Sequence, residues 1–126
     1  MKIFILEDNP ERMKFFNWYF PFEKFQIFHA DNVAEAKIIY EKEEPFDLLL
    51  LDHDLGGEVY VDSNNQNTGY QFAKFLITKI LNDIPIIIHS LNPYGVENMK
   101  ALLPQAHCIS FPILAHKLVK KEMVIE

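Results

Sequence analysis

The stretch Phe46-Asp47-Leu48-Leu49-Leu50-Leu51-Asp52-His53-Asp54-Leu55-Gly56-Gly57 decides the fold. A short, continuous apolar run of this kind is typical of a strand that is buried on both faces. Such strands belong to parallel sheets covered by helices, and in open α/β sheets ligands bind at the carboxyl ends of the strands. Asp52, His53 and Asp54 come directly after the apolar run. The stretch therefore predicts a functional site at this end of the strand.

Working outward, the chain alternates between short apolar runs and segments with helical periodicity. Asn-Pro pairs at 9–10 and 92–93 combine a good N-cap with proline at the first helical position. Strands are predicted at residues 2–6, 25–29, 46–51, 85–90 and 107–111. Helices are predicted at residues 10–19, 33–43, 70–81, 93–103 and 113–123, with Ile80 on the inner face of the third. Between them lies a polar loop over 52–68, in which Glu58–Val61 is a candidate for half of a small hairpin.

Five strands alternating with five helices predict one α/β domain over residues 1–126, with a parallel sheet and right-handed crossovers. The flavodoxin-like, three-layer arrangement with strand order 2-1-3-4-5 is the leading prediction. That order makes strands one, three and four neighbours, and it gathers the polar residues at their carboxyl ends: Glu7, Asp8, Asp52, His53, Asp54, His89 and Ser90. Because side chains alternate along a strand, we expect Asp52 and Asp54 to point in one direction.

Composition narrows the functional classes. The chain of 126 residues has a net charge of −6, which argues against unaided nucleic-acid binding and predicts no DNA-binding domain. No apolar run reaches membrane-spanning length, and no segment has the pattern of a signal peptide, so we predict a cytoplasmic protein without a membrane partner. The single cysteine, Cys108, fits a reducing compartment and is expected to be a small core residue.

Several carboxylates gathered at one point repel each other unless a cation offsets their charge. Oxygen ligands favour Mg²⁺, Mn²⁺ or Ca²⁺, and the imidazoles make a transition metal conceivable. The helix N-terminus after Asn92 suits an anion, so metal and anion together indicate phosphate chemistry, with His53 and His89 as candidate acid and base. Each motif also has a structural explanation: an acidic turn at Glu7-Asp8, loop caps at Asp52 and Asp54, hydrogen-bonded histidines, and turn, cap or helix-start roles for Ser90, Asn92 and Thr68-Gly69.

Glu7-Asp8, Asp52 and Ser90 resemble the phosphoacceptor pocket of response-regulator receiver domains. The resemblance implies that Glu7, Asp8 and Asp52, with the backbone carbonyl at Asp54, hold Mg²⁺, and that Asp52 accepts a phosphoryl group. Receivers carry a lysine before the proline that follows strand five. Here Phe111 precedes Pro112, which is a departure from the receiver pattern.

A second resemblance covers nearly the whole chain. Its motifs are Leu51-Asp52-His53-Asp54-Leu55-Gly56, then Thr68-Gly69-Tyr70, then His89-Ser90-x-Asn92-Pro93-x-Gly95-x-x-x-Met99. Together they resemble the cyclic-phosphate-processing receiver-like family. That resemblance implies a receiver fold with a rebuilt pocket that acts on cyclic phosphates of nucleotides or RNA ends. Family members often carry an arginine close after the acidic pair, whereas here Asn9-Pro10 intervenes and Arg12 comes later.

On this interpretation the catalytic candidates are Asp52, His53, His89 and Ser90. The metal candidates are Glu7, Asp8, Asp52 and Asp54, with Mg²⁺ preferred over Mn²⁺, and the candidates for ligand binding are Thr68, Gly69, Asn92 and Gly95. Two alternatives stay open. One is a stand-alone receiver with a protein partner in signalling, and the other is a non-catalytic module that binds a nucleotide or a protein.

Overall fold

A parallel five-stranded sheet in the order β2-β1-β3-β4-β5 forms the centre of the protein, as predicted. The computed structural model describes residues 1–79, 81 and 83–125. The strands are β1 (Lys2–Leu6), β2 (Gln26–Ala30), β3 (Leu48–Leu51), β4 (Ile86–Ile88) and β5 (His107–Cys108). The helices are α1 (Pro10–Tyr19), α2 (Val33–Glu43), α3 (Gly69–Leu76), α4 (Pro93–Leu102) and α5 (Phe111–Val119).

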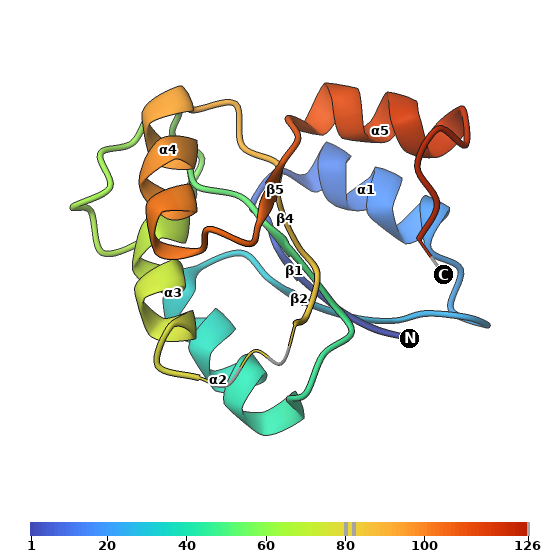
Figure 1. Cartoon of the computed structure of the whole chain (residues 1–126), viewed down its shortest axis with the longest axis horizontal. Helices are drawn as coiled ribbons and strands as arrows, with labels where there is room; N and C mark the ends of the chain where they lie inside the picture. Colours follow the sequence, from blue (N-terminus) through green and yellow to red (C-terminus); the bar gives the residue numbers. More distant parts are fainter. Residues whose placement is uncertain (80, 82, 126) are drawn as a thin grey trace.

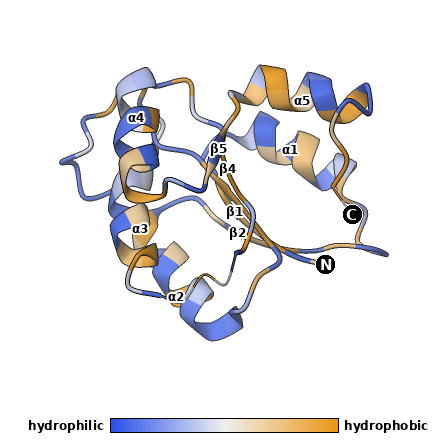
Figure 2. Cartoon of the chain, in the orientation of Figure 1, coloured by the Kyte–Doolittle hydropathy of each residue, from blue (hydrophilic) through white to orange (hydrophobic). Residues whose placement is uncertain are grey.

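Helices cover both faces of the sheet: α1 and α5 lie on one side, and α2, α3 and α4 on the other (Figure 1). Side chains alternate along the strands, so Ile3 and Ile5 enter the core beneath α1 and α5, while Phe4 and Leu6 enter the opposite core. The strands β3 and β4 at the centre of the sheet are apolar along their length, whereas the helices also carry hydrophilic residues (Figure 2). This two-sided burial explains why the run Leu48–Leu51 lacks polar residues.

Four helices begin with a side-chain cap, which the sequence pattern indicates at Asn9, Thr68 and Asn92. Asn9, Asn32, Thr68 and Asn92 occupy the N-cap positions of α1 to α4, and their side-chain oxygens accept backbone N–H groups from the first turn. These bonds satisfy donors that a helix N-terminus otherwise leaves unpaired. The caps matter for function because α1, α3 and α4 all start beside the carboxyl ends of the strands.

Several element boundaries in the C-terminal half differ from the prediction, including the end of α5, which lies at Val119 and not at Met123. Helix α3 ends at Leu76, because the amides of Thr78 and Lys79 bond three residues back and form a tight turn. The expectation for Ile80 lies outside the described residues. Strand β5 has two residues, and Phe111, expected to end that strand, begins α5 instead. The predicted core position of Cys108 is wrong, because its side chain is exposed at the edge of the sheet.

The loop after β3 is irregular and does not contain the hairpin considered for Glu58–Val61. Its two ends meet in an isolated antiparallel bridge between Asp54 and Thr68. The loop therefore begins and ends at neighbouring positions, and it returns the chain to the start of α3. Within the described residues, no helix combines the length and apolar character needed to cross a membrane.

Candidate functional site

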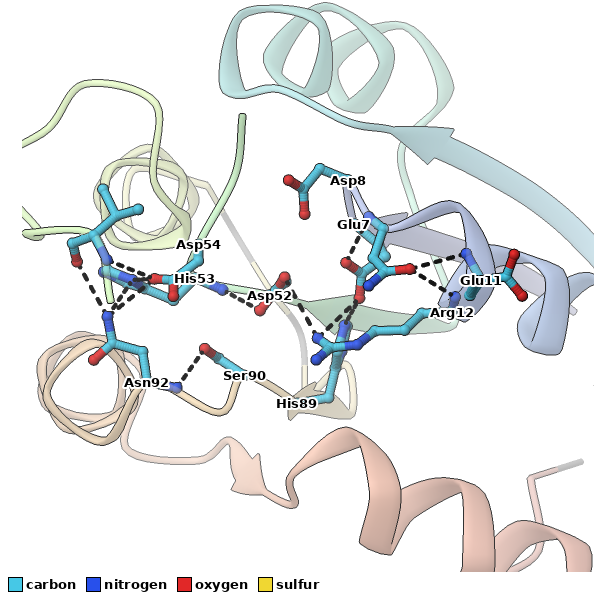
Figure 3. Close-up of polar contacts among 12 residues, drawn as sticks. Glu7, Asp8, Glu11, Arg12, Asp52, His53, Asp54, His89, Ser90 and Asn92 are labelled. Atoms are coloured by element: carbon cyan, nitrogen blue, oxygen red, sulfur yellow. Dashed lines mark hydrogen bonds and ion pairs between the residues drawn. The ribbon is translucent and has the colours of Figure 1, made fainter. Parts of the chain in front are cut away.

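Glu7, Asp52 and His89 converge at the carboxyl ends of the three central strands. All three are buried, and one candidate ligand atom from each lies within 4.8 Å of the others. The Nε2 atom of His89 hydrogen-bonds to Oε1 of Glu7 at 2.8 Å across 82 residues of sequence. This is the convergence that the strand order predicts, and a close-up shows the three side chains facing one another (Figure 3).

A cation supplied by the chain lies beside this cluster. The Nη1 atom of Arg12 is 3.7 Å from Oε1 of Glu7 and 3.8 Å from Oδ2 of Asp52. Its guanidinium also lies over the ring of Phe111, 5.2 Å from the ring centroid. Arg12 reaches the site because Asn9 starts α1 immediately after β1, which places the first turn of the helix over the strand ends. Sequence reasoning left Arg12 out of the candidate site, although its place one turn after a capped strand end was a usable signal.

Electrostatics distinguish the carboxylates. Burial and the neighbouring charge of Glu7 raise the pKa of Asp52 to about 8, although the His53 amide and Arg12 act in the opposite direction. Burial would also raise the pKa of Glu7, but hydrogen bonds and charges from His89, Asn9 and Arg12 outweigh it and lower this pKa. Burial together with the charge of Glu7 raises the pKa of Asp8, whose Oδ2 accepts the Gly57 amide at 2.6 Å. The positive charge that the protein places around Asp52 is therefore too small to offset burial and the charge of Glu7.

A second network holds the loop. The Nδ1 atom of His53 donates to Oδ1 of Asp54 at 2.8 Å, and its Nε2 is 2.9 Å from Oγ of Ser63. Asn92 donates to the same Asp54 oxygen at 2.9 Å. Burial opposes ionisation of Asp54, but these bonds and the amides of Tyr60 and Val61 outweigh it and lower its pKa. An ionised, fully bonded Asp54 therefore anchors the loop to α4.

Asp52 and Asp54 do not point in one direction, and that prediction is wrong. Asp52 faces Glu7 and Arg12, whereas Asp54 faces His53 and Asn92 (Figure 3). The reason is that β3 ends at Leu51, so strand alternation no longer applies to the residues that follow. The cluster around Asp52 and the network around Asp54 are still connected, because the amide of His53 donates to Oδ1 of Asp52 at 2.8 Å.

A cleft of about 340 Å³ lies against this cluster. Its polar lining includes Asp8, Arg12, Asp52, Asp54, Glu58 and Ser90, and its apolar lining includes Val59, Tyr60 and Leu91. The hydroxyl of Ser90 accepts the amide of Asn92 at 3.0 Å, which fixes it at the rim. Neither His53 nor His89 lines the cleft, because both rings are fully buried.

The four residues predicted to bind ligand all support the backbone around the site. Thr68 and Asn92 cap α3 and α4, and the amide of Gly69 donates to the carbonyl of His53 at 2.8 Å. A Cβ on Gly69 would lie 1.9 Å from the carbonyl oxygen of Asp52, and a Cβ on Gly95 would lie 2.4 Å from Cγ of His53. None of the four lines the cleft, so their contact with a ligand stays a prediction.

Replacing Gly95 by alanine should destabilise the fold, because the new methyl group would overlap the His53 ring, which is held from two sides. Overpacking of this kind costs about 1–3 kcal/mol. Thermal unfolding monitored by circular dichroism would measure the loss. The matched control is Glu97→Ala on the exposed side of α4, which should change stability by less than about 0.5 kcal/mol. Equal stability of the two variants would show that the close packing of Gly95 on His53 is unimportant.

A sequence profile of the cyclic-phosphate processing Receiver domain family matches residues 2–105. The chain belongs to this family. The motifs after β3, before α3 and after β4 all fall within the matched range, and the resemblance inferred from them is confirmed. No curated protein sequence matches the chain significantly.

Solved structures of receiver domains share the fold. The phosphorylated cyanobacterial phytochrome response regulator RcpA aligns with a TM-score of 0.71 at 18% identity, over 96% of this chain and 90% of that one. The Mn²⁺-bound response regulator Rcp1 gives 0.69 at 12%, over 99% and 96%. A CheY-like receiver domain from Methylobacillus flagellatus gives 0.66 at 13%, over 97% of each chain. At these identities the likeness establishes the fold alone, that of a receiver-like domain related to response regulators.

The residues at the strand ends fit a divalent cation. Two carboxylates and one imidazole offer ligand atoms within reach of one ion. The raised pKa of Asp52 indicates a carboxylate with too little positive charge around it, which a cation would correct. Within the described part of the chain, Nδ1 of His89 is a buried polar atom without a hydrogen-bond partner, so this ring is not saturated by the protein.

Proposed function

We propose that this receiver-like domain processes cyclic phosphate esters of nucleotides or RNA ends with the help of a divalent cation, by adding water across a P–O bond and so opening the ring. The observation that carries the proposal is the meeting of Glu7, Asp52 and His89 beside a cleft that Arg12 also lines. Acidic ligands and a guanidinium together suit a phosphodiester, because they hold a cation and a phosphate in one place.

Glu7 and Asp52 would hold the cation, with His89 as a third ligand or as the group that orients Glu7. Mg²⁺ suits the carboxylates, and Mn²⁺ suits a set that includes imidazole. Mn²⁺ is also the ion named for the structural neighbour Rcp1. The cation would neutralise phosphate charge and activate water. Asp8 lines the same cleft and would add a further carboxylate beside the cation.

The chain itself would bind and orient the phosphate. Arg12 is partly accessible from the cleft, and its planar donors suit two phosphate oxygens. The oxygen of Ser90 already accepts a backbone N–H, so its own proton remains available for a phosphate oxygen. His53 is better suited to positioning, because both ring nitrogens are engaged with loop residues.

The test is turnover of adenosine 2′,3′-cyclic phosphate by the purified protein with Mg²⁺ or Mn²⁺, followed by chromatography. We expect a single nucleoside monophosphate, formed only while the cation is present and lost on chelation. If the protein neither turns over nor binds the ester with either ion, the proposal is overturned.

A parallel incubation with acetyl phosphate separates the signalling alternative from the enzymatic one. A receiver would gain a phosphoryl group on Asp52, which intact mass spectrometry detects. We expect no adduct, because Phe111 occupies the position at which the receiver pattern has its lysine. A stable adduct without turnover of the cyclic ester would favour the receiver alternative.

A further inference from the structure

The cleft is lined by polar and by apolar residues, and the proposed phosphate chemistry uses only the polar ones. Besides the polar residues, Val59, Tyr60 and Leu91 line the same cleft. Their side chains are 77%, 72% and 52% exposed. Large apolar side chains left in solvent next to a polar pocket are typical of a binding surface. The cleft of about 340 Å³ also falls in the size range of small-molecule sites rather than of a bare ion.

The backbone at Tyr60 is held in an uncommon conformation. Its φ of 54° lies in the left-handed region, which a bulky residue adopts at an energetic cost. The amide of Tyr60 donates to Oδ2 of Asp54 at 2.6 Å, and the amide of Val61 donates to Oδ1 at 3.2 Å. Conformations of this type persist where the surroundings over-determine them, and they concentrate at functional sites.

The surroundings here are the buried network described above. His53 and Asn92 fix Asp54, and Asn92 additionally donates to the carbonyl of Val61 at 3.1 Å. The carboxylate of Asp54 therefore determines the position of the Tyr60 backbone. The hydrogen bonds to Asp54 hold the backbone of Tyr60 next to the polar residues of the cleft.

We propose that Tyr60, with Val59 and Leu91, forms a stacking wall for the base of a nucleoside phosphate whose phosphate group binds the polar residues of the same cleft. The inference rests on the proposed function and assigns the part of its site that binds the planar base of the substrate. Aromatic side chains bind bases of any sequence by stacking, because every base offers a π face. Specificity for one base would need further polar contacts, so this wall recognises a base as such.

The test compares adenosine 2′,3′-cyclic phosphate with glycerol 1,2-cyclic phosphate, which has the strained ring but no base. The wild-type protein should have a KM for the adenosine ester about ten-fold lower or more. Tyr60→Ala should remove this preference by raising KM for the adenosine ester, with little change in kcat and no change for the glycerol ester. Tyr60→Phe should keep the preference, because the ring is retained.

Tyr94→Ala is the matched control, since Tyr94 is 78% exposed but does not line the cleft. It should leave both esters unaffected. Because alanine at residue 60 keeps the strained φ, Tyr60→Gly tests the same contact without that strain and should behave like Tyr60→Ala. Thermal unfolding of every variant verifies that the fold is intact.

A direct readout does not depend on turnover. Stacking on a tyrosine ring should move the adenine H2 and H8 resonances upfield when the adenosine ester binds in the presence of Mg²⁺, and Tyr60→Ala should abolish that movement. An oligonucleotide that ends in a 2′,3′-cyclic phosphate distinguishes an RNA end from a free nucleotide, and either source supports the stacking wall.

Equal KM values for the two esters in the wild-type protein, or an unchanged preference in Tyr60→Ala, would overturn the inference while leaving the phosphate chemistry in place. If neither ester is bound or turned over, the proposed function fails, and the stacking wall fails with it.

Discussion

Replacing Asp52 by asparagine should abolish turnover of the cyclic ester and, at the same time, make the cation-free protein more stable. Loss of one cation-holding carboxylate is expected to lower kcat by about 10²–10³-fold or more. Stability should change in the opposite direction, because Asp52 is buried beside Glu7 and the two charges repel. The amide keeps the shape of the side chain and cannot ionise. A gain of about 1–3 kcal/mol in the free energy of unfolding is expected at pH 8.

The raised pKa of Asp52 determines whether the substitution increases or decreases the free energy of unfolding. Burial and the charge of Glu7 raise the pKa of Asp52 to about 8 from the ordinary value of 3.8. Between these values the folded protein keeps a proton that the unfolded chain releases. The free energy of unfolding of the cation-free wild type should therefore fall as pH rises from about 4 to about 8. Asp52→Asn lacks this proton, so it should be more stable than the wild type by a margin that widens over the same interval.

Added Mg²⁺ or Mn²⁺ provides the complementary measurement. An ion that binds only the folded state at 100 times its Kd adds about 2.7 kcal/mol. The wild type should gain this stability and Asp52→Asn should not. Asp47→Asn is the control, because Asp47 lies at the opposite end of β3 and accepts the Lys2 amide. Thermal unfolding at several pH values covers all three proteins. A loss of stability in Asp52→Asn, or stabilisation of Asp52→Asn by the ion as strong as that of the wild type, would contradict this account of Asp52.

The fold could be predicted because short-range rules decide most of it. Short apolar runs define β1 and β3, and the Asn-Pro pairs at 9–10 and 92–93 mark helix starts that the structure confirms. Alternation of strands and helices then determines the topology, and topology alone brings Glu7, Asp52 and His89 together. Their convergence needed no knowledge of side-chain detail.

Other features of the site depend on where an element ends, which local pattern does not settle. The direction of Asp54 follows from the end of β3 at Leu51, and the position of Phe111 follows from β5 having only two residues. Apolar residues continue past Leu76 with helical spacing, so the end of α3 depends on a turn that periodicity does not reveal. Tyr60 carried no sequence signal, because a left-handed tyrosine inside a long polar loop is imposed by the bonds of Asp54 to the surrounding amides.

Replacing Arg12 by alanine should weaken phosphate binding strongly while leaving the fold in place. Its guanidinium lies within 3.8 Å of both Glu7 and Asp52, and its side chain is only 18% exposed. A cation held in position in this way can be worth about 10²–10³-fold in kcat/KM when the developing charge lies on phosphate oxygens. Arg12→Lys should recover part of the loss, because it restores the charge but not the planar, two-pronged donor geometry.

Phe111 explains how the guanidinium is kept in place. The ring lies 5.2 Å below Cζ of Arg12, and it also packs edge-on against Phe15 and Phe16 of α1. Phe111→Leu keeps apolar volume but removes the π face, and it should lower kcat/KM by about 2–30-fold, the range that corresponds to a cation–π contact of 0.5–2 kcal/mol. The effect should vanish in an Arg12→Ala background, because the ring then has no guanidinium to hold.

The double variant Arg12→Ala, Phe111→Lys moves the cation from α1 to the start of α5, which is the position that the receiver pattern gives to lysine. If the guanidinium over Phe111 replaces that lysine, the double variant should bind inorganic phosphate with Mg²⁺ more tightly than Arg12→Ala alone, by about ten-fold, as measured by calorimetry. Acetyl phosphate and intact mass would then show whether Asp52 has also become a phosphoacceptor. No recovery of phosphate binding in a folded double variant would mean that the position of the cation on α1, and not merely its charge, is what the pocket requires.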